Sequence, residues 1–292
     1  MFNLCVTILV AQSNIRLNNY WDNTYFINPA SINEEYQAVF SLAARKQWMG
    51  FPGSPSTIFA SATSYINNIQ TQFGIKVFAD KLGYNSISNL NLSYSYAVIL
   101  NRDWQLNMGV AGSFQNLSYD KSQVNMANGD DPALYKNLLQ QSNFNTDIGF
   151  ELINDTWKFG TSGQNLFSLI YDENTVQINS DYLYAMYRKR TNKPIELQYG
   201  VCGIKYGSLY QMEFNITTFF KFQQESDVFQ VGLLYRTKTE MGLIFGFNFN
   251  ENMHMTYGYD FNVSGISRSS IGTHELMLVY NFNKVPYKRY RY

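Results

Sequence analysis

The sequence predicts an all-β protein, a closed antiparallel transmembrane β-barrel of about 14 strands whose lumen is at least partly filled. Charged residues make up only 15% of the 292 residues, against about 25% in an average soluble protein. Aromatic residues reach 17%, yet no run approaches the ~20 apolar residues that a membrane helix needs. Apolar and polar residues instead alternate with period two along much of the chain, as they do in strands with one lipid-facing and one lumen-facing side.

The beginning of the chain resembles an export signal. Residues 4–11, Leu-Cys-Val-Thr-Ile-Leu-Val-Ala, have the composition of the apolar core of a secretory signal peptide, with Ala11 as the small residue before the cleavage site. We therefore predict that residues 1–11 are a truncated signal peptide, since no basic residue precedes the apolar core. A buried N-terminal strand is the alternative. We expect an N-terminal extended segment over 12–36, the barrel over 37–282, and a basic and aromatic tail over 283–292.

The barrel strands follow from the alternation. In residues 90–100, for example, Leu, Tyr and Val take every second position, and Asn, Ser and Ala stand between them. Most segments reach the ~9–11 residues that a tilted strand needs to cross a bilayer, and closure is expected because an open sheet edge in hydrocarbon leaves backbone groups unpaired. The predicted segments are 37–48, 56–66, 71–80, 88–100, 103–116, 143–153, 156–164, 180–191, 195–206, 209–223, 227–237, 240–249, 253–263 and 272–282.

The polar face of these strands separates a barrel from a soluble sandwich. A sandwich normally carries Lys and Glu on its water-facing side. Here the polar positions are mostly Asn, Ser, Gln, Gly and Thr, with few charges. This composition favours a filled lumen over an open ion-selective pore.

One insertion interrupts the strand pattern at residues 117–142. Asp130 or Asp131 can cap a helix that has Pro132 at its first position, and residues 133–139 then give about two turns of helix. Two interpretations remain open: a helix that packs on the barrel rim, or a loop that docks a partner, since the longer loops of barrels face the outside.

The sequence offers little chemistry. Neither His254 nor His274 has a second His or Cys at metal-ligand spacing, and Cys5 and Cys202 make no disulfide framework. A Gly-x-Ser-x-Gly nucleophile elbow and a P-loop are both missing from the sequence. We therefore predict no catalytic residue, no cofactor and no metal site. The net charge of zero gives no basic footprint for nucleic acid.

The order of several short motifs points to a family. They are Tyr20-Trp21 followed by Tyr25-Phe26-Ile27-Asn28-Pro29-Ala30, then residues 44–48, 50–57, 92–96, 143–149 and 272–282. Taken together, they resemble the PorP/SprF family of outer-membrane proteins of the type IX secretion system, which is associated with gliding motility. The resemblance covers nearly all of the chain that follows residue 11.

The resemblance implies a non-enzymatic barrel in the outer membrane of a diderm bacterium. Such a barrel binds, helps to secrete or anchors cargo adhesins at the cell surface through their C-terminal secretion domain. The implied partners are outer-membrane lipid, that adhesin domain, and the periplasmic type IX secretion ring or peptidoglycan-binding components, with no nucleic acid among them. The alternative function is an outer-membrane channel or transporter for small or apolar solutes.

The first candidate site is the Asn28-Pro29-Ala30 motif. Pro29 fixes its own φ angle and pushes Asn28 to an extended conformation. The Asn28 side chain can then bond nearby backbone, so that the motif holds a turn before the first strand. Direct contact of the motif with a partner is the other interpretation.

Three further candidates lie near the ends of the barrel sequence. An inward-facing Arg45 needs lumenal carboxylates or carbonyl groups as partners, and Trp48 is a candidate anchor at the membrane interface. Glu275 alternates with the apolar positions that follow it, so we expect it to face inward. It is then a partner for Arg45 or Lys46 where the barrel closes.

Overall fold

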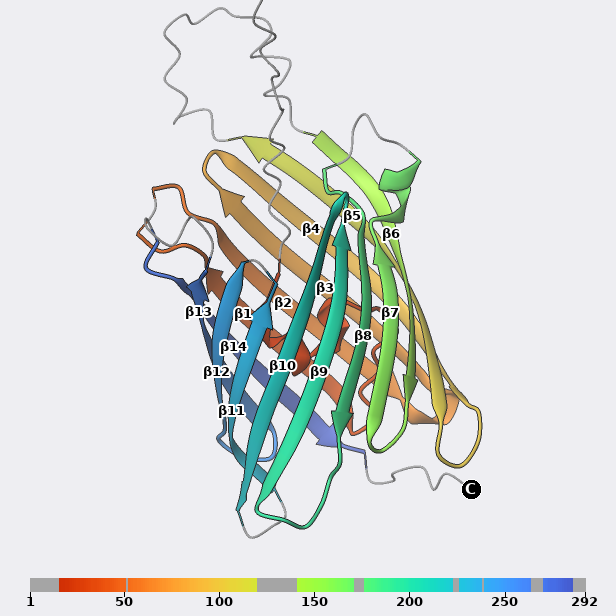
Figure 1. The fold of residues 1–292 in the computed structure, drawn as a ribbon. Coiled ribbons are helices and arrows are strands. Elements are labelled where there is room, and N and C mark those ends of the chain that lie inside the picture. Colours follow the sequence, from red (N-terminus) through yellow and green to blue (C-terminus); the bar gives the residue numbers. More distant parts are fainter. Residues whose placement is uncertain are drawn as a thin grey trace, which may run out of the picture.

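The chain forms one closed barrel of strands in a computed structural model that describes residues 16–50, 52–119, 141–170, 176–222, 226–237, 239–263 and 270–285 (Figure 1). Each strand pairs antiparallel with both neighbours, and β1 closes the barrel against β14. The strands are β1 (Tyr36–Lys46), β2 (Ser56–Ile66), β3 (Thr71–Leu82), β4 (Asn85–Ile99), β5 (Gln105–Tyr119), β6 (Gln141–Ile153), β7 (Trp157–Gln164), β8 (Ser180–Arg188), β9 (Ile195–Tyr206), β10 (Leu209–Phe222), β11 (Ser226–Arg236), β12 (Glu240–Asn248), β13 (Met253–Asn262) and β14 (Thr273–Lys284).

The predicted fold class and strand number are therefore confirmed: the barrel is all-β, antiparallel and closed, with 14 strands. It extends from Tyr36 to Lys284, slightly beyond the predicted 37–282. Within the described residues the helices are short 3-10 helices, namely η1 (Asn18–Trp21), η2 (Thr24–Phe26), η3 (Asn67–Ile69) and η5 (Leu166–Leu169), and none of them could cross a membrane. The predicted signal peptide, the predicted helix at 133–139 and residues 286–292 of the predicted tail lie outside the described residues.

Alternation along each strand separates an apolar outer face from a polar inner face. On β4, Leu92 and Tyr94 are 59% and 45% exposed, whereas Ser93 and Ser95 between them are buried. Successive strand residues point to opposite faces of the sheet, so the two halves of the pattern sort into lipid-facing and lumen-facing positions. This arrangement is the one that the alternation predicts.

The two ends of the barrel differ. The longer connections (47–55, 120–140, 165–179 and 263–272) join strands at one end, which we call the loop end. The start of β1 and the last residues of β14 lie at the opposite end, the turn end, drawn at the bottom of Figure 1.

A substitution on the outer face tests which residues meet lipid. We expect Tyr94→Arg to lower the free energy of unfolding by ~2–4 kcal/mol, because an arginine near the middle of β4 meets hydrocarbon. The matched control, Tyr210→Arg at the loop-end start of β10, should cost about 0–1 kcal/mol. Urea titration in lipid vesicles, monitored by gel mobility with and without heating, measures the free energy of unfolding of both variants. Equal costs at the two positions would contradict a mid-membrane location of Tyr94.

Candidate functional site

Residues 16–34 run through the inside of the barrel, from its loop end to its turn end (Figure 1). Arg16 donates to Gln211 near the loop-end start of β10, and Gln105 at the turn-end start of β5 donates to Glu34. We call residues 17–33 the inner segment. Most of its side chains are buried: the exposed fraction is 3% for Tyr20 and zero for Asn28.

The sequence predicts an extended segment over residues 12–36, but the inner segment is not simply extended. Two 3-10 helices, η1 and η2, shorten it, and the Asn23 side chain between them accepts a hydrogen bond from the Tyr25 backbone amide (3.2 Å). Asparagine offers the backbone such local side-chain bonds as an alternative to extended structure. The compact turns fit these residues into the interior of the barrel.

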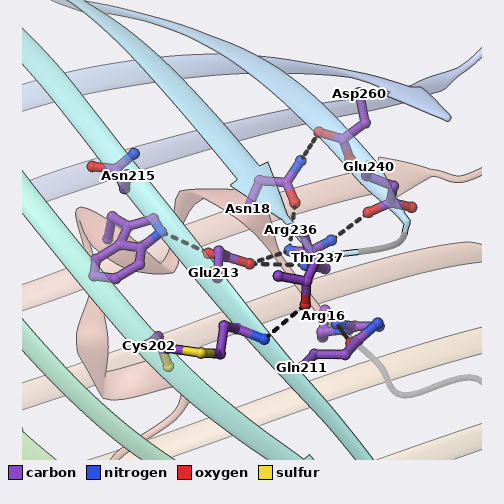
Figure 2. Close-up of polar contacts among 12 residues, drawn as sticks. Arg16, Asn18, Cys202, Gln211, Glu213, Asn215, Arg236, Thr237, Glu240 and Asp260 are labelled. Atoms are coloured by element: carbon purple, nitrogen blue, oxygen red, sulfur yellow. Dashed lines mark hydrogen bonds and ion pairs between the residues drawn. The ribbon is translucent and has the colours of Figure 1, made fainter. Parts of the chain in front are cut away.

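A buried ion cluster lies inside the loop end. We call it the loop-end ion cluster; it consists of Arg45, Glu213, Arg236, Glu240, Asp260 and Glu275. Arg236 binds Glu213 (2.6 Å) and Glu240, as Figure 2 shows. Arg45 binds Glu275 (2.9 Å) and Asp260 (3.0 Å). Pairing and hydrogen bonding of this kind are what buried charges require.

The first residues of the inner segment are hydrogen-bonded to this cluster. The backbone amides of Asn18 and Asn19 donate to the two carboxylate oxygens of Glu275 at 2.8 and 2.9 Å. The Asn18 side chain donates to Asp260 (2.5 Å; Figure 2), and the indole N–H of Trp21 donates to Glu213 (2.7 Å). Hydrogen bonds to ionised acceptors are stronger than neutral ones, so the cluster fixes this part of the inner segment firmly.

Asn28 connects the middle of the inner segment to the wall. Its Oδ1 accepts from the Ala30 backbone amide (2.9 Å), which is the local bond expected of a turn. Its Nδ2 also donates to the Phe150 carbonyl and to the Tyr184 hydroxyl, both at 3.0 Å. The side chain therefore holds the turn and binds β6 and β8 at the same time.

Inward-facing glycines make room for this contact. A Cβ at Gly149 would overlap the Asn28 side chain, and one at Gly109 would overlap the backbone at Ala30. Glycine thus lets the inner segment approach the strands more closely than any other residue allows.

The remaining sequence candidates divide between the cluster and the rim. Arg45 and Glu275 are opposite each other across the β1–β14 seam and join the loop-end ion cluster. Trp48 does not: it lies in the β1–β2 connection with a φ of 52°, and its backbone N–H donates to Thr273 (3.2 Å). In the ranges that the structure covers, no group of three or more His, Cys, Asp or Glu side chains is arranged to hold a metal ion.

A family model for the "Type IX secretion system membrane protein PorP/SprF" matches residues 9–280, which is nearly the whole chain. The chain belongs to the PorP/SprF family. It is therefore a type IX secretion membrane protein with a barrel fold. No curated protein matches it.

Solved structures similar to this PorP/SprF barrel are also membrane barrels. A "TodX deltaS2S3 mutant monoaromatic hydrocarbon channel" aligns with a TM-score of 0.56 and 10% sequence identity, and the alignment covers 89% of this chain and 94% of the channel. The "CymD monoaromatic hydrocarbon channel" has a TM-score of 0.53 at 9% identity, with 88% and 92% covered. At such identities the likeness shows the fold alone.

Sequence reasoning missed part of this site in the PorP/SprF barrel. Glu213, Arg236, Glu240 and Asp260 were not among the candidates. Their signal was available: Glu213 stands between Met212 and Phe214 on an alternating strand, so its phase is inward. In a chain with so few charges, a charge at an inward position already indicates a buried partner of opposite sign.

Proposed function

We propose that this PorP/SprF protein is a non-enzymatic barrel of the outer membrane of a diderm bacterium, reached by export through the signal at residues 1–11. In this proposal it binds, helps to secrete or anchors cargo adhesins at the cell surface through their C-terminal secretion domain. The observation that carries it is the engagement of the lumen wall by the chain's own inner segment, from Asn18 to Asn33. With the interior engaged in this way, the rims and loops are the surfaces left for partners.

The ionisable groups of the barrel support a non-enzymatic role. The carboxylates of the loop-end ion cluster are paired with arginines, as in a structural network. Nδ1 of His254 is hydrogen-bonded to Asn248, and Nδ1 of His274 to the Tyr257 hydroxyl (2.6 Å). We assign a structural role within the lumen to Asn28, Pro29, Ala30, Arg45 and Glu275, and keep Trp48 on the loop-end rim as a candidate contact for partners.

Deletion of the gene tests this function. We expect one or a few large adhesins to disappear from the cell surface and to be degraded or released into the medium, while general secretion of other cargo continues. Restoring the gene with both His254→Ala and His274→Ala, at normal protein levels, should restore surface display, because neither histidine has a catalytic role in the proposal. A well-folded histidine variant that fails to restore display would contradict the non-enzymatic assignment.

The proposed partners need a separate test. Pull-down from detergent-solubilised membranes, with the bound proteins identified by mass spectrometry, should recover the adhesin C-terminal domain and periplasmic components of the secretion ring or of peptidoglycan binding. A preparation that holds neither class would leave lipid as the remaining partner and would overturn the anchoring role.

A channel for small or apolar solutes is the second candidate function. It is favoured by the fold shared with two solved monoaromatic hydrocarbon channels, the TodX deltaS2S3 mutant and CymD. A channel needs a continuous path through the lumen, so steady current across a planar bilayer separates it from the anchoring function.

A further inference from the structure

The lumen wall recognises the inner segment largely through its backbone. Ser162 donates to the Ile27 carbonyl and Ser95 to the Pro29 carbonyl, both at 2.6 Å. Gln72 donates to the Ser31 carbonyl (2.8 Å) and accepts from the Asn33 amide (3.0 Å). These wall groups come from separate strands of one closed sheet, and the pairing of those strands fixes the positions of their backbones relative to one another.

A second group of wall contacts involves the side chains of the inner segment. The Tyr25 hydroxyl shares a hydrogen bond with Ser93 (2.7 Å), and Trp21 lies where a Cβ at Gly200 would overlap its ring. The Asn28 amide nitrogen donates to the Phe150 carbonyl and the Tyr184 hydroxyl. Ala30 is fully buried, and its backbone lies where a Cβ at Gly109 would overlap it. The sequence that fits is thus a tyrosine three residues before Asn-Pro-Ala, with a tryptophan upstream.

We propose that the lumen wall is a polypeptide-binding site whose resident ligand is the inner segment in cis. The site takes a peptide segment that carries the Tyr-x-x-Asn-Pro-Ala pattern, and it binds that segment by preformed donors and acceptors rather than by covalent connection to β1. This inference goes beyond the proposed function and does not depend on which cargo the barrel serves. Its physical basis is that a rigid, preorganised site loses little entropy when the ligand returns.

A trans-complementation experiment tests the site. A barrel that lacks residues 12–33 is refolded in detergent and titrated with a fluorescently labelled synthetic peptide of residues 16–33. We expect saturable binding, at least tenfold weaker for a peptide with Asn28→Ala and undetectable for a scrambled peptide. Equal binding of the scrambled peptide, or no saturable binding by a heat-modifiable barrel, would overturn the inference.

Wall variants provide the matched comparison. Gly109→Val should weaken binding of the peptide at least tenfold, because its side chain occupies the place of the Ala30 backbone. Gly203→Val is the control: it lies on the outward phase of β9, where the nearest atom to an added Cβ is 3.8 Å away. Equal affinities of these two barrels for the peptide would overturn the proposed location of the site.

A cleavage variant covers the case in which the shortened barrel does not fold. A protease site is inserted between Glu34 and Glu35, and the full chain is folded first and cut afterwards. We expect the cut segment to stay bound and to exchange with excess peptide 16–33, but not with the scrambled peptide. Immediate release of the cut segment, or its displacement by the scrambled peptide, would overturn the inference.

Discussion

Glu275→Ala should lower the free energy of unfolding of the barrel by about 3–5 kcal/mol, because it removes one partner from a buried ion pair. Glu275 is 1% exposed and binds Arg45 across the β1–β14 seam. The variant leaves the buried Arg45 guanidinium without one of its carboxylate partners, and it leaves the backbone amides of Asn18 and Asn19 without their acceptor. Urea titration in lipid vesicles, read by gel mobility and tryptophan fluorescence, measures the loss.

Lys205→Ala is the matched control for this experiment. Lys205 pairs with Asp181 at 3.4 Å, but both side chains are about 40% exposed, so we expect a cost of about 0–1 kcal/mol. The double variant Arg45→Ala with Glu275→Ala should lose less than the sum of the two single variants, since residues in contact are not additive. A cost for Glu275→Ala no larger than that of the control would show that the loop-end ion cluster contributes little to stability.

Deleting the inner segment should have the second large effect, on conductance. We expect the full-length barrel to show little steady current in planar bilayers, and a barrel lacking residues 17–33 to conduct steadily. Barrels of about eight strands are filled by their own side chains, whereas those of 16–18 leave an aqueous channel. At 14 strands, with a polar inner face, removal of a buried segment opens a path for water and ions.

The control for conductance keeps the inner segment and changes the outer face. Gly203→Val should leave the current of the full-length barrel unchanged, because this position faces away from the lumen. Steady current through the full-length barrel, equal to that of the deletion variant, would contradict a closed lumen and favour the channel function.

Most of the barrel was predictable because strands have a period of two and a one-residue slip moves every side chain to the other face. The pattern therefore defined both the strands and the faces, and it placed Glu275 inward. It could not show how much room an inward residue has. From the alternation alone, Ser95 is an ordinary lumenal serine that a longer polar residue could replace. In the structure it has no exposed surface and its hydroxyl binds the Pro29 carbonyl.

The inner segment was the least predictable part. Residues 18–26 contain aromatic and Asn residues without strand or helix periodicity, a composition equally suited to a rim, a loop or an interior. Their position depends on hydrogen bonds to carboxylates that follow more than 190 residues later in the chain, such as the bond from Trp21 to Glu213. Pairs so distant in sequence leave no local pattern to recognise.

The double use of Glu275 has a consequence for assembly. The same carboxylate that meets Arg45 at the seam accepts the amides of Asn18 and Asn19, and the hydrogen bond from Asn18 joins positions 257 residues apart. Contacts between distant parts of a chain form late, because the loop-closure entropy must be overcome first. The backbone amides of Asn18 and Asn19 therefore have their acceptor only once β14 is in place. The last strand in the chain closes the barrel wall and also completes the attachment of the first residues of the inner segment.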